Sequence, residues 1–212
     1  MDISPANRVN HHADHPGFAG PMGLFAALTM LIAGRRRARL VADLASVSSS
    51  DRVVDIGCGP GNSVRAAARR GARAIGVDPA MVMIGVARLV TRDRPNIMWL
   101  QGSAENLPLP EQSATVVWSV ATVHHWADVA AGLVEARRVL VPGGRFVVIE
   151  RRVRPGARGL ASHGWTDQQA ASFAAYCRTA GLDDVRVETL NHGRRAVQVA
   201  SAIRRPTLQR GQ

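Results

Sequence analysis

The sequence contains no lysine, and each of its 27 basic residues is an arginine. Against 16 acidic residues, these arginines leave a formal net charge of +11, so an anionic partner or substrate has to be considered. The arginines occur in small scattered groups rather than in one stripe, and only 4% of the residues are aromatic. Because nucleic acids bind along basic grooves that carry stacking aromatic rings, this pattern argues against nucleic acid as the partner.

Cysteines and long apolar runs are also scarce. The two cysteines, Cys58 and Cys177, make no disulfide framework and have no neighbours at metal-ligand spacing, so we expect no metal and a reducing, cytoplasmic setting. The longest apolar run, Met22 to Ala33, has about half of the roughly 20 residues that a membrane span requires. The arginines that follow it leave a weak peripheral membrane contact open.

Three histidines lie close together near the start of the chain: His11, His12 and His15. Without a cysteine or carboxylate cluster nearby, they favour a flexible arm over a metal site. Leucines at positions 24, 28 and 31 then predict an amphipathic helix that packs on the sheet or covers a site as a lid. We therefore expect residues 1–45 to form an arm and a lid helix, residues 46–203 the main domain, and residues 204–212 a flexible tail.

From residue 53 onward, apolar β-branched runs alternate with helical stretches. Five runs predict buried strands, at residues 53–56, 74–77, 97–100, 115–120 and 145–150. Two more, near residues 185–189 and 196–200, predict a C-terminal hairpin. Helix signals include Asp128 as an N-cap and a capping box from Thr166 to Gln169. The predicted fold is α/β: a Rossmann-like, doubly wound, mostly parallel seven-stranded sheet with helices on both faces and an antiparallel C-terminal hairpin.

Unusual residues follow four successive predicted strands. The first strand ends in a glycine cluster, residues 57–61, which lets backbone N–H groups approach a ligand closely. The second ends in Asp78, a carboxylate that can accept two hydrogen bonds from a ribose diol. Right-handed crossovers bring the carboxyl ends of parallel strands to one edge of the sheet. We therefore expect these residues to meet there with residues 102–108 and 119–126.

These segments resemble the motifs of class I S-adenosylmethionine-dependent methyltransferases of the type 11 group, which includes quinone and other small-molecule methyltransferases. Residues 53–61 look like motif I, and residues 76–79 look like the second motif. Residues 102–108 and 139–144 resemble the third motif and the pattern after the fourth strand, so that the resemblance covers about residues 50–150. It implies transfer of a methyl group from S-adenosylmethionine to an oxygen, nitrogen or carbon nucleophile of a small molecule.

The resemblance also implies a role for each matching position. Asp55 and Gly57 would hold the methionine part of the cofactor, Asp78 would take the ribose hydroxyls, and Ser103 would face the adenine edge. Many relatives carry Asp where Ser103 stands, so this chain brings no charge to that edge. The full set implied for the cofactor is Asp55, Gly57, Cys58, Gly59, Asp78, Pro79, Ser103, Ala104 and Ser119.

His124 and His125 follow the fourth strand, where the transferred methyl group should lie. Imidazole titrates near neutrality and can accept the proton of an acceptor group. We predict His125, with His124 second, as a general base; the alternative is that both line the pocket or cap the next helix. The short basic segment 151–165 is expected to form the acceptor pocket together with the N-terminal helix, and its arginines would suit a carboxylate or phosphate.

Three other functions stay open at this point. An NAD(P)-dependent oxidoreductase requires G-x-G-x-x-G, whereas the glycines stand at 57, 59 and 61. An RNA methyltransferase acting on base amines is expected to carry Asn-Pro-Pro-aromatic after the fourth strand, but residues 119–122 read Ser-Val-Ala-Thr. The third alternative is a non-catalytic cofactor binder. The oligomeric state and the acceptor are left open.

Overall fold

The computed structural model describes residues 8–13, 20–92, 94–193 and 195–205. The strands are β1 (Arg52–Ile56), β2 (Arg73–Asp78), β3 (Ile97–Gln101), β4 (Ala114–Val120), β5 (Leu140–Arg151), β6 (Leu182–His192) and β7 (Arg195–Arg204). The α-helices are α1 (Gly20–Ala33), α2 (Arg35–Leu44), α3 (Asn62–Ala68), α4 (Met81–Leu89), α5 (Val129–Val139) and α6 (Asp167–Thr179). β5, β6 and β7 are longer than the apolar runs that predicted them, because their ladders continue into more polar sequence.

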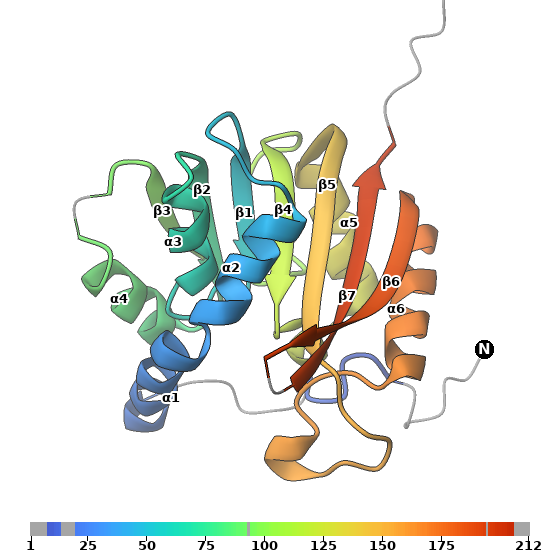
Figure 1. The fold of residues 1–212 in the computed structure, drawn as a ribbon. Coiled ribbons are helices and arrows are strands. Elements are labelled where there is room, and N and C mark those ends of the chain that lie inside the picture. The colour runs from blue at the N-terminus through green and yellow to red at the C-terminus, as the bar shows by residue number, and fades with distance from the viewer. Residues whose placement is uncertain (1–7, 14–19, 93, 194, 206–212) are drawn as a thin grey trace, which may run out of the picture.

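The seven strands form one sheet in the order β3-β2-β1-β4-β5-β7-β6 (Figure 1). Neighbouring strands from β3 to β5 are parallel, and β7 runs antiparallel to both β5 and β6. α2, α3 and α4 pack on one face around a core that includes Trp118, and α5 and α6 pack on the other around Trp165 and Phe173. The predicted doubly wound sheet and its antiparallel C-terminal hairpin are confirmed.

The predicted helix starts are also confirmed. The Asp128 carboxylate accepts hydrogen bonds from the N–H groups of Ala130 and Ala131 and so caps α5. At α6, Thr166 and Gln169 exchange the two reciprocal hydrogen bonds of a capping box. Both caps lie at the edge of the sheet that carries the site, and they fix where these helices begin.

The prediction for the N-terminal helix was wrong in two respects. The chain forms two helices that meet at Gly34, and most of the leucine stripe is not buried: Leu24 and Leu28 are 45% and 51% exposed, and only Leu31 packs in part against α4. The residues that α1 buries are small, Gly23 and Ala27, because they allow close packing against α4. Within the described ranges, no helix is long and apolar enough to cross a membrane.

The described part of the N-terminal arm is packed rather than flexible. Val9 is 2% exposed, and its carbonyl accepts a hydrogen bond of 3.1 Å from the indole N–H of Trp165. The side chain of Asn10 donates to the carbonyls of Trp126 and Ala127 at 2.9 and 3.0 Å. The expected flexible arm was therefore wrong for residues 8–13, while His15 lies outside the described residues.

The expected flexible tail was wrong at its beginning. Arg204 is the last residue of β7, and its guanidinium donates to the carbonyls of Arg137 and Arg138. Arg205 forms an ion pair with Asp183 at 2.8 Å. Residues 206–212 lie outside the described residues.

Candidate functional site

A cavity of about 320 Å³ opens where the strand order reverses. β1 pairs with β2 on one side and with β4 on the other, both in parallel, so the chain leaves this point in opposite directions. Ligands of doubly wound sheets bind outside the carboxyl ends of the strands at such a switch point. Seven of the predicted site residues line this cavity together: Asp55, Gly57, Cys58, Gly59, Asp78, His124 and His125.

The glycine turn after β1 forms the floor of the cavity. The N–H groups of Gly57 and Cys58 both donate to the carbonyl of Val77, at 2.8 and 3.0 Å. Gly57 has a φ of 73°, and a Cβ there would lie 2.6 Å from Oγ1 of Thr122. At Gly59, with φ of 51°, a Cβ would have one neighbour within 4 Å, the sulfur of Met30 at 3.9 Å. The open space over Gly59 is the close-approach surface that the glycines predicted.

Asp78 ties this turn to the end of β2. One carboxylate oxygen accepts from the N–H of Gly59 at 2.8 Å, and the other accepts from the N–H of Ala80 at 2.9 Å. Burial nevertheless raises the pKa of this carboxyl above its ordinary value. Because each carboxylate oxygen can accept more than one hydrogen bond, Asp78 can hold the turn and still receive ribose hydroxyls.

Asp55 is a buried carboxyl without a full set of partners. The side chain is 2% exposed, and Oδ1 has no hydrogen-bond partner among the described residues. Burial, reinforced by the charge of Asp78, raises the pKa of Asp55 to about 8. A ligand that brings a cationic donor to this oxygen would satisfy it and stabilise the ionised form.

Cys58 lines the cavity but is not a reactive thiol. It is 7% exposed, and burial raises the pKa of the thiol well above its ordinary value. Since the thiolate is the nucleophilic form, the sulfur stays inert at neutral pH. Cys58 therefore fits the turn as a small residue with an unreactive thiol.

Four residues of the predicted cofactor set are not among the described residues that line this cavity: Pro79, Ser103, Ala104 and Ser119. Ser119 is fully buried, and its hydroxyl lies 2.5 Å from that of Thr122, which also donates to the carbonyl of Ile56. Ser119 thus helps to position Thr122, the residue against which Gly57 packs. Ser103 forms an isolated bridge with Asn106, and Ala104 belongs to the core. Their roles toward the cofactor stay predictions.

The two predicted histidines lie on a short 3₁₀ helix, Val123–His125, after β4. His124 is 2% exposed, and its Nδ1 lies 2.9 Å from Oε2 of the fully buried Glu150, while Oε1 of Glu150 accepts from the N–H of Val123. Burial, followed by the charges of His124 and His163, lowers the pKa of His125 to about 3. The two neighbouring imidazoles therefore have different surroundings: His124 is paired with the Glu150 carboxylate, whereas His125 lies beside other imidazoles.

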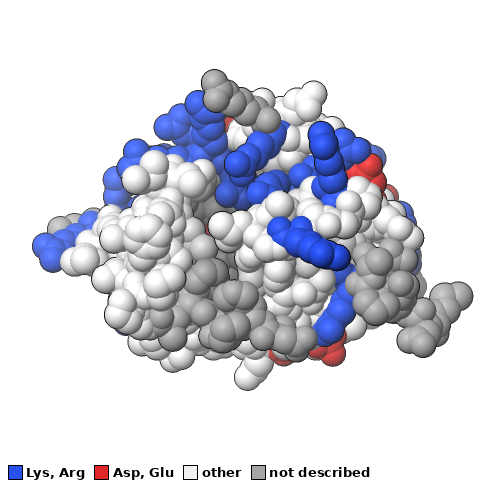
Figure 2. Space-filling model, turned by 90° about the horizontal axis from the view of Figure 1, so that it is seen from below, with Lys and Arg blue, Asp and Glu red and all other residues white. Residues whose placement is uncertain are grey.

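The cavity also contains residues that no local motif predicted. Arg37 comes from α2, Arg195 from β7, and His163 from the loop before α6. His163 and Arg151 belong to the basic segment 151–165, which was expected at the acceptor pocket. Nothing in the sequence around Arg37 or Arg195 predicted that these residues would line the cavity. Figure 2 views this edge of the sheet and shows basic side chains gathered mainly on one side of a hollow, in the upper part of the view.

Comparisons with known proteins identify the family and the fold that this chain resembles. The family model described as "Methyltransferase domain" matches residues 54–148. The demethylmenaquinone methyltransferase of Tropheryma whipplei (strain Twist) is 34% identical over 112 residues, which are 53% of this chain and 46% of that protein. The chain thus covers about half the length of the relatives it matches, such as the uncharacterized methyltransferase YcgJ of Bacillus subtilis.

Solved structures show the same fold at lower identity. A SAM-dependent methyltransferase from Aquifex aeolicus superposes with a TM-score of 0.71 at 15% identity, over 85% of this chain and 98% of that one. Phosphoethanolamine N-methyltransferase 2 of Haemonchus contortus, in complex with S-adenosyl-L-methionine, gives a TM-score of 0.70 at 16% identity over 94% and 60% of the two chains.

Residues 54–148 match the methyltransferase-domain family, and the fold is that of S-adenosylmethionine-dependent methyltransferases of known structure. The cofactor is S-adenosylmethionine, and the nicotinamide alternative is set aside. The cavity fits this cofactor, because it offers an orphaned buried carboxylate oxygen at Asp55, an open glycine surface at Gly59 and the Asp78 carboxylate for the ribose.

The protonation of Asp55 predicts a signature of cofactor binding. With a pKa of about 8, most of this carboxyl is protonated at neutral pH, and the cationic amino group of S-adenosylhomocysteine would favour its ionised form. We therefore expect binding to release protons, so that the calorimetric enthalpy differs between phosphate and Tris buffers. Asp55→Asn should abolish this difference and weaken binding by about tenfold or more, equivalent to roughly 1.4 kcal/mol.

Asp128→Asn is the matched control, because asparagine also caps helices well and Asp128 is exposed. It should leave both the affinity and the buffer dependence unchanged. Equal enthalpies in the two buffers for the unmodified protein would contradict the assignment of Asp55.

Proposed function

We propose that the protein transfers the methyl group of S-adenosylmethionine to a nucleophile on a small, anionic molecule. The observation that carries this proposal is one cavity that joins Asp55 and Asp78 to histidines and arginines. The sulfonium of the cofactor makes its methyl group electrophilic, so the protein chiefly has to hold the nucleophile in line with it. Such positioning can contribute several kcal/mol to lowering the barrier.

The arginines supply the argument for an anionic acceptor. Arg37, Arg151 and Arg195 reach the same cavity from three different elements. Burial, followed by the charges of Arg195 and Arg37, lowers the pKa of Arg151, so the positive charge there is incompletely balanced. Arg151 donates to the carbonyls of Leu160 and Ala161, which fixes it in place. A carboxylate or phosphate on the acceptor would balance this charge.

His124 is the better placed of the two histidines to take a proton from the acceptor. When Nδ1 donates to Glu150, the opposite nitrogen Nε2 carries the lone pair, and the carboxylate stabilises the cation that forms on proton uptake. The lowered pKa of His125 makes that ring a weaker base. His125 then lines the cavity and keeps its own neutral ring beside the acceptor.

The acceptor class is tested by a panel of matched molecules with and without a carboxylate or phosphate, using cofactor labelled in its methyl group. We expect the anionic members to be methylated preferentially. Arg195→Gln should raise KM for such an acceptor by about tenfold or more while leaving the dissociation constant of S-adenosylhomocysteine unchanged, because the lost charge would contact only the acceptor.

Arg178→Gln, on an exposed position of α6, is the control and should change neither quantity. If Arg195→Gln weakens cofactor binding instead, the arginines hold the carboxylate of the cofactor and the proposed acceptor class is wrong. Transfer to RNA alone would favour an RNA methyltransferase. Transfer to no acceptor at all would favour a non-catalytic cofactor binder.

The role of the His124–Glu150 pair is tested by Glu150→Gln. Glutamine has nearly the same shape but no charge to stabilise a protonated His124. In buffer with EDTA we expect kcat to fall by about tenfold or more, with the acidic limb of its pH profile changed and with S-adenosylhomocysteine binding retained. An unchanged kcat and pH profile would show that His124 accepts no proton in the rate-limiting step.

A further inference from the structure

Five of the seven histidines in the sequence gather beside the cavity: His11, His12, His124, His125 and His163. They come from three segments that lie far apart in the sequence, namely the N-terminal turn, the 3₁₀ helix after β4 and the loop before α6. The ring centroids of His124 and His125 are 4.2 Å apart, and those of His12 and His163 are 4.3 Å apart. A histidine that only fills the core does not require other histidines beside it, whereas a ligand bound by several imidazoles would explain the cluster.

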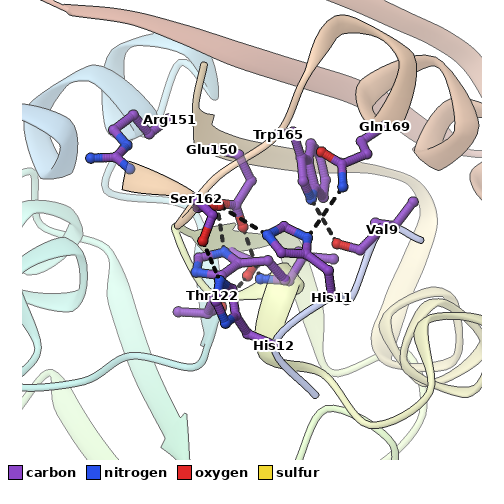
Figure 3. A network of polar contacts seen from close by, with 12 residues as sticks. Val9, His11, His12, Thr122, Glu150, Arg151, Ser162, Trp165 and Gln169 are labelled. Atoms are coloured by element: carbon purple, nitrogen blue, oxygen red, sulfur yellow. Dashed lines mark hydrogen bonds and ion pairs between the residues drawn. The ribbon is translucent and has the colours of Figure 1, made fainter. Parts of the chain in front are cut away.

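The N-terminal turn holds the loop of His163 in this position. The His11 ring lies within hydrogen-bond distance of the carbonyl of Ser162, at 2.9 Å, and the His12 ring lies 3.1 Å from the hydroxyl of the same residue. Figure 3 shows His11, His12 and Ser162 converging beside Thr122 and Glu150. The cluster is therefore built by tertiary contacts that also fix its position in the wall of the cavity.

His124 has the surroundings of a metal ligand. Its Nδ1 is paired with the buried carboxylate of Glu150 at 2.9 Å, and its Nε2 is buried without a hydrogen-bond partner among the described residues. Metal-binding histidines are commonly oriented in this way, with one ring nitrogen donating to a carboxylate and the other on the metal. The orphaned Nε2 therefore points to a ligand that the protein itself does not supply.

Two further histidines complete a ligand set. His124, His125 and His163 each offer one ring nitrogen, and these three nitrogens lie within 4.8 Å of one another. Around a tetrahedral zinc ion, with Zn–N bonds of about 2.1 Å, ligand nitrogens lie roughly 3.4 Å apart. Small rotations that move each nitrogen by about 1 Å would close the set around one ion.

We propose that His124, His125 and His163 bind one divalent transition-metal ion of the zinc class, with Glu150 orienting His124. Neutral imidazoles are ligands that select such ions over calcium and magnesium. Three protein ligands leave a fourth position open, as at catalytic rather than structural zinc sites, and all three histidines line the cavity. No metal site was predicted from the sequence, because only the fold brings His163 to His124 and His125.

The proposal does not rest on methyl transfer, since an ion can bind in the absence of cofactor and acceptor. Metal binding would give the site two forms, one without the ion and one with it. An ion on Nε2 of His124 occupies the lone pair that would otherwise accept a proton, so the metal-free and metal-loaded proteins differ in their proton acceptor.

The test uses the full chain without a histidine tag, stripped with EDTA and then titrated with Zn²⁺ by calorimetry and with Co²⁺ by visible absorption. We expect one equivalent of Zn²⁺ per chain and the intense d–d bands of four-coordinate Co²⁺. His163→Ala should lower the affinity by about a hundredfold or more, and Glu150→Gln, which removes the carboxylate that orients His124, should lower it by about tenfold.

His192→Ala is the matched control, because this histidine lies on β6 outside the cluster, and it should bind Zn²⁺ as the unmodified chain does. Circular dichroism confirms that each variant is folded, and S-adenosylhomocysteine binding on the same samples tests the cofactor site separately. A folded chain that binds cofactor but takes up no Zn²⁺ overturns the metal site alone. Equal losses of affinity in His163→Ala and His192→Ala overturn it as well.

Discussion

The site depends on the two hydrogen bonds that the carboxylate of Asp78 accepts from backbone N–H groups. This carboxylate joins the glycine turn after β1 to the first turn of α4 through the N–H groups of Gly59 and Ala80. Without it, the turn itself would be joined to β2 by the two backbone hydrogen bonds to the carbonyl of Val77, and its position would be less well defined. A group that organises the cavity before a ligand arrives reduces the ordering cost of binding.

The opposite wall is assembled from segments that are distant in the sequence. Glu150, at the end of β5, holds both the backbone of Val123 and the ring of His124, so that β5 positions the residues after β4. The N-terminal turn then packs on this wall through Val9, whose carbonyl is bound by Trp165. The wall with the glycine turn thus depends on neighbouring strands, whereas the wall with the histidines depends on contacts across the whole chain.

This difference explains which features were predictable from the sequence. Strands, helix caps and the glycine turn are local, so the apolar runs, Asp128 and the cluster at residues 57–61 predicted them correctly. The leucine stripe of α1 showed that the helix has an apolar face but could not show that the smaller Gly23 and Ala27 would be the buried positions. In the same way, nothing near Arg195 indicates that β7 brings it to the cavity.

The histidines illustrate the same limit at the level of chemistry. His124 and His125 were predicted at the acceptor side because they follow β4, but their surroundings depend on Glu150, which is 26 residues away in the sequence from His124. His11 and His12 suggested a flexible arm because no partner lies near them in the sequence, and their contacts with Ser162 span about 150 residues. Such partners become visible only in the folded chain.

The most direct measurement is a crystal structure of the protein with S-adenosylhomocysteine bound. We expect the ribose hydroxyls on Asp78, the amino group beside Asp55, and the sulfur directed toward His124 and the arginines. A ligand bound in the reverse orientation, with its adenine against His124, or bound outside the cavity at the β1–β4 switch point, would contradict the assignment of the site.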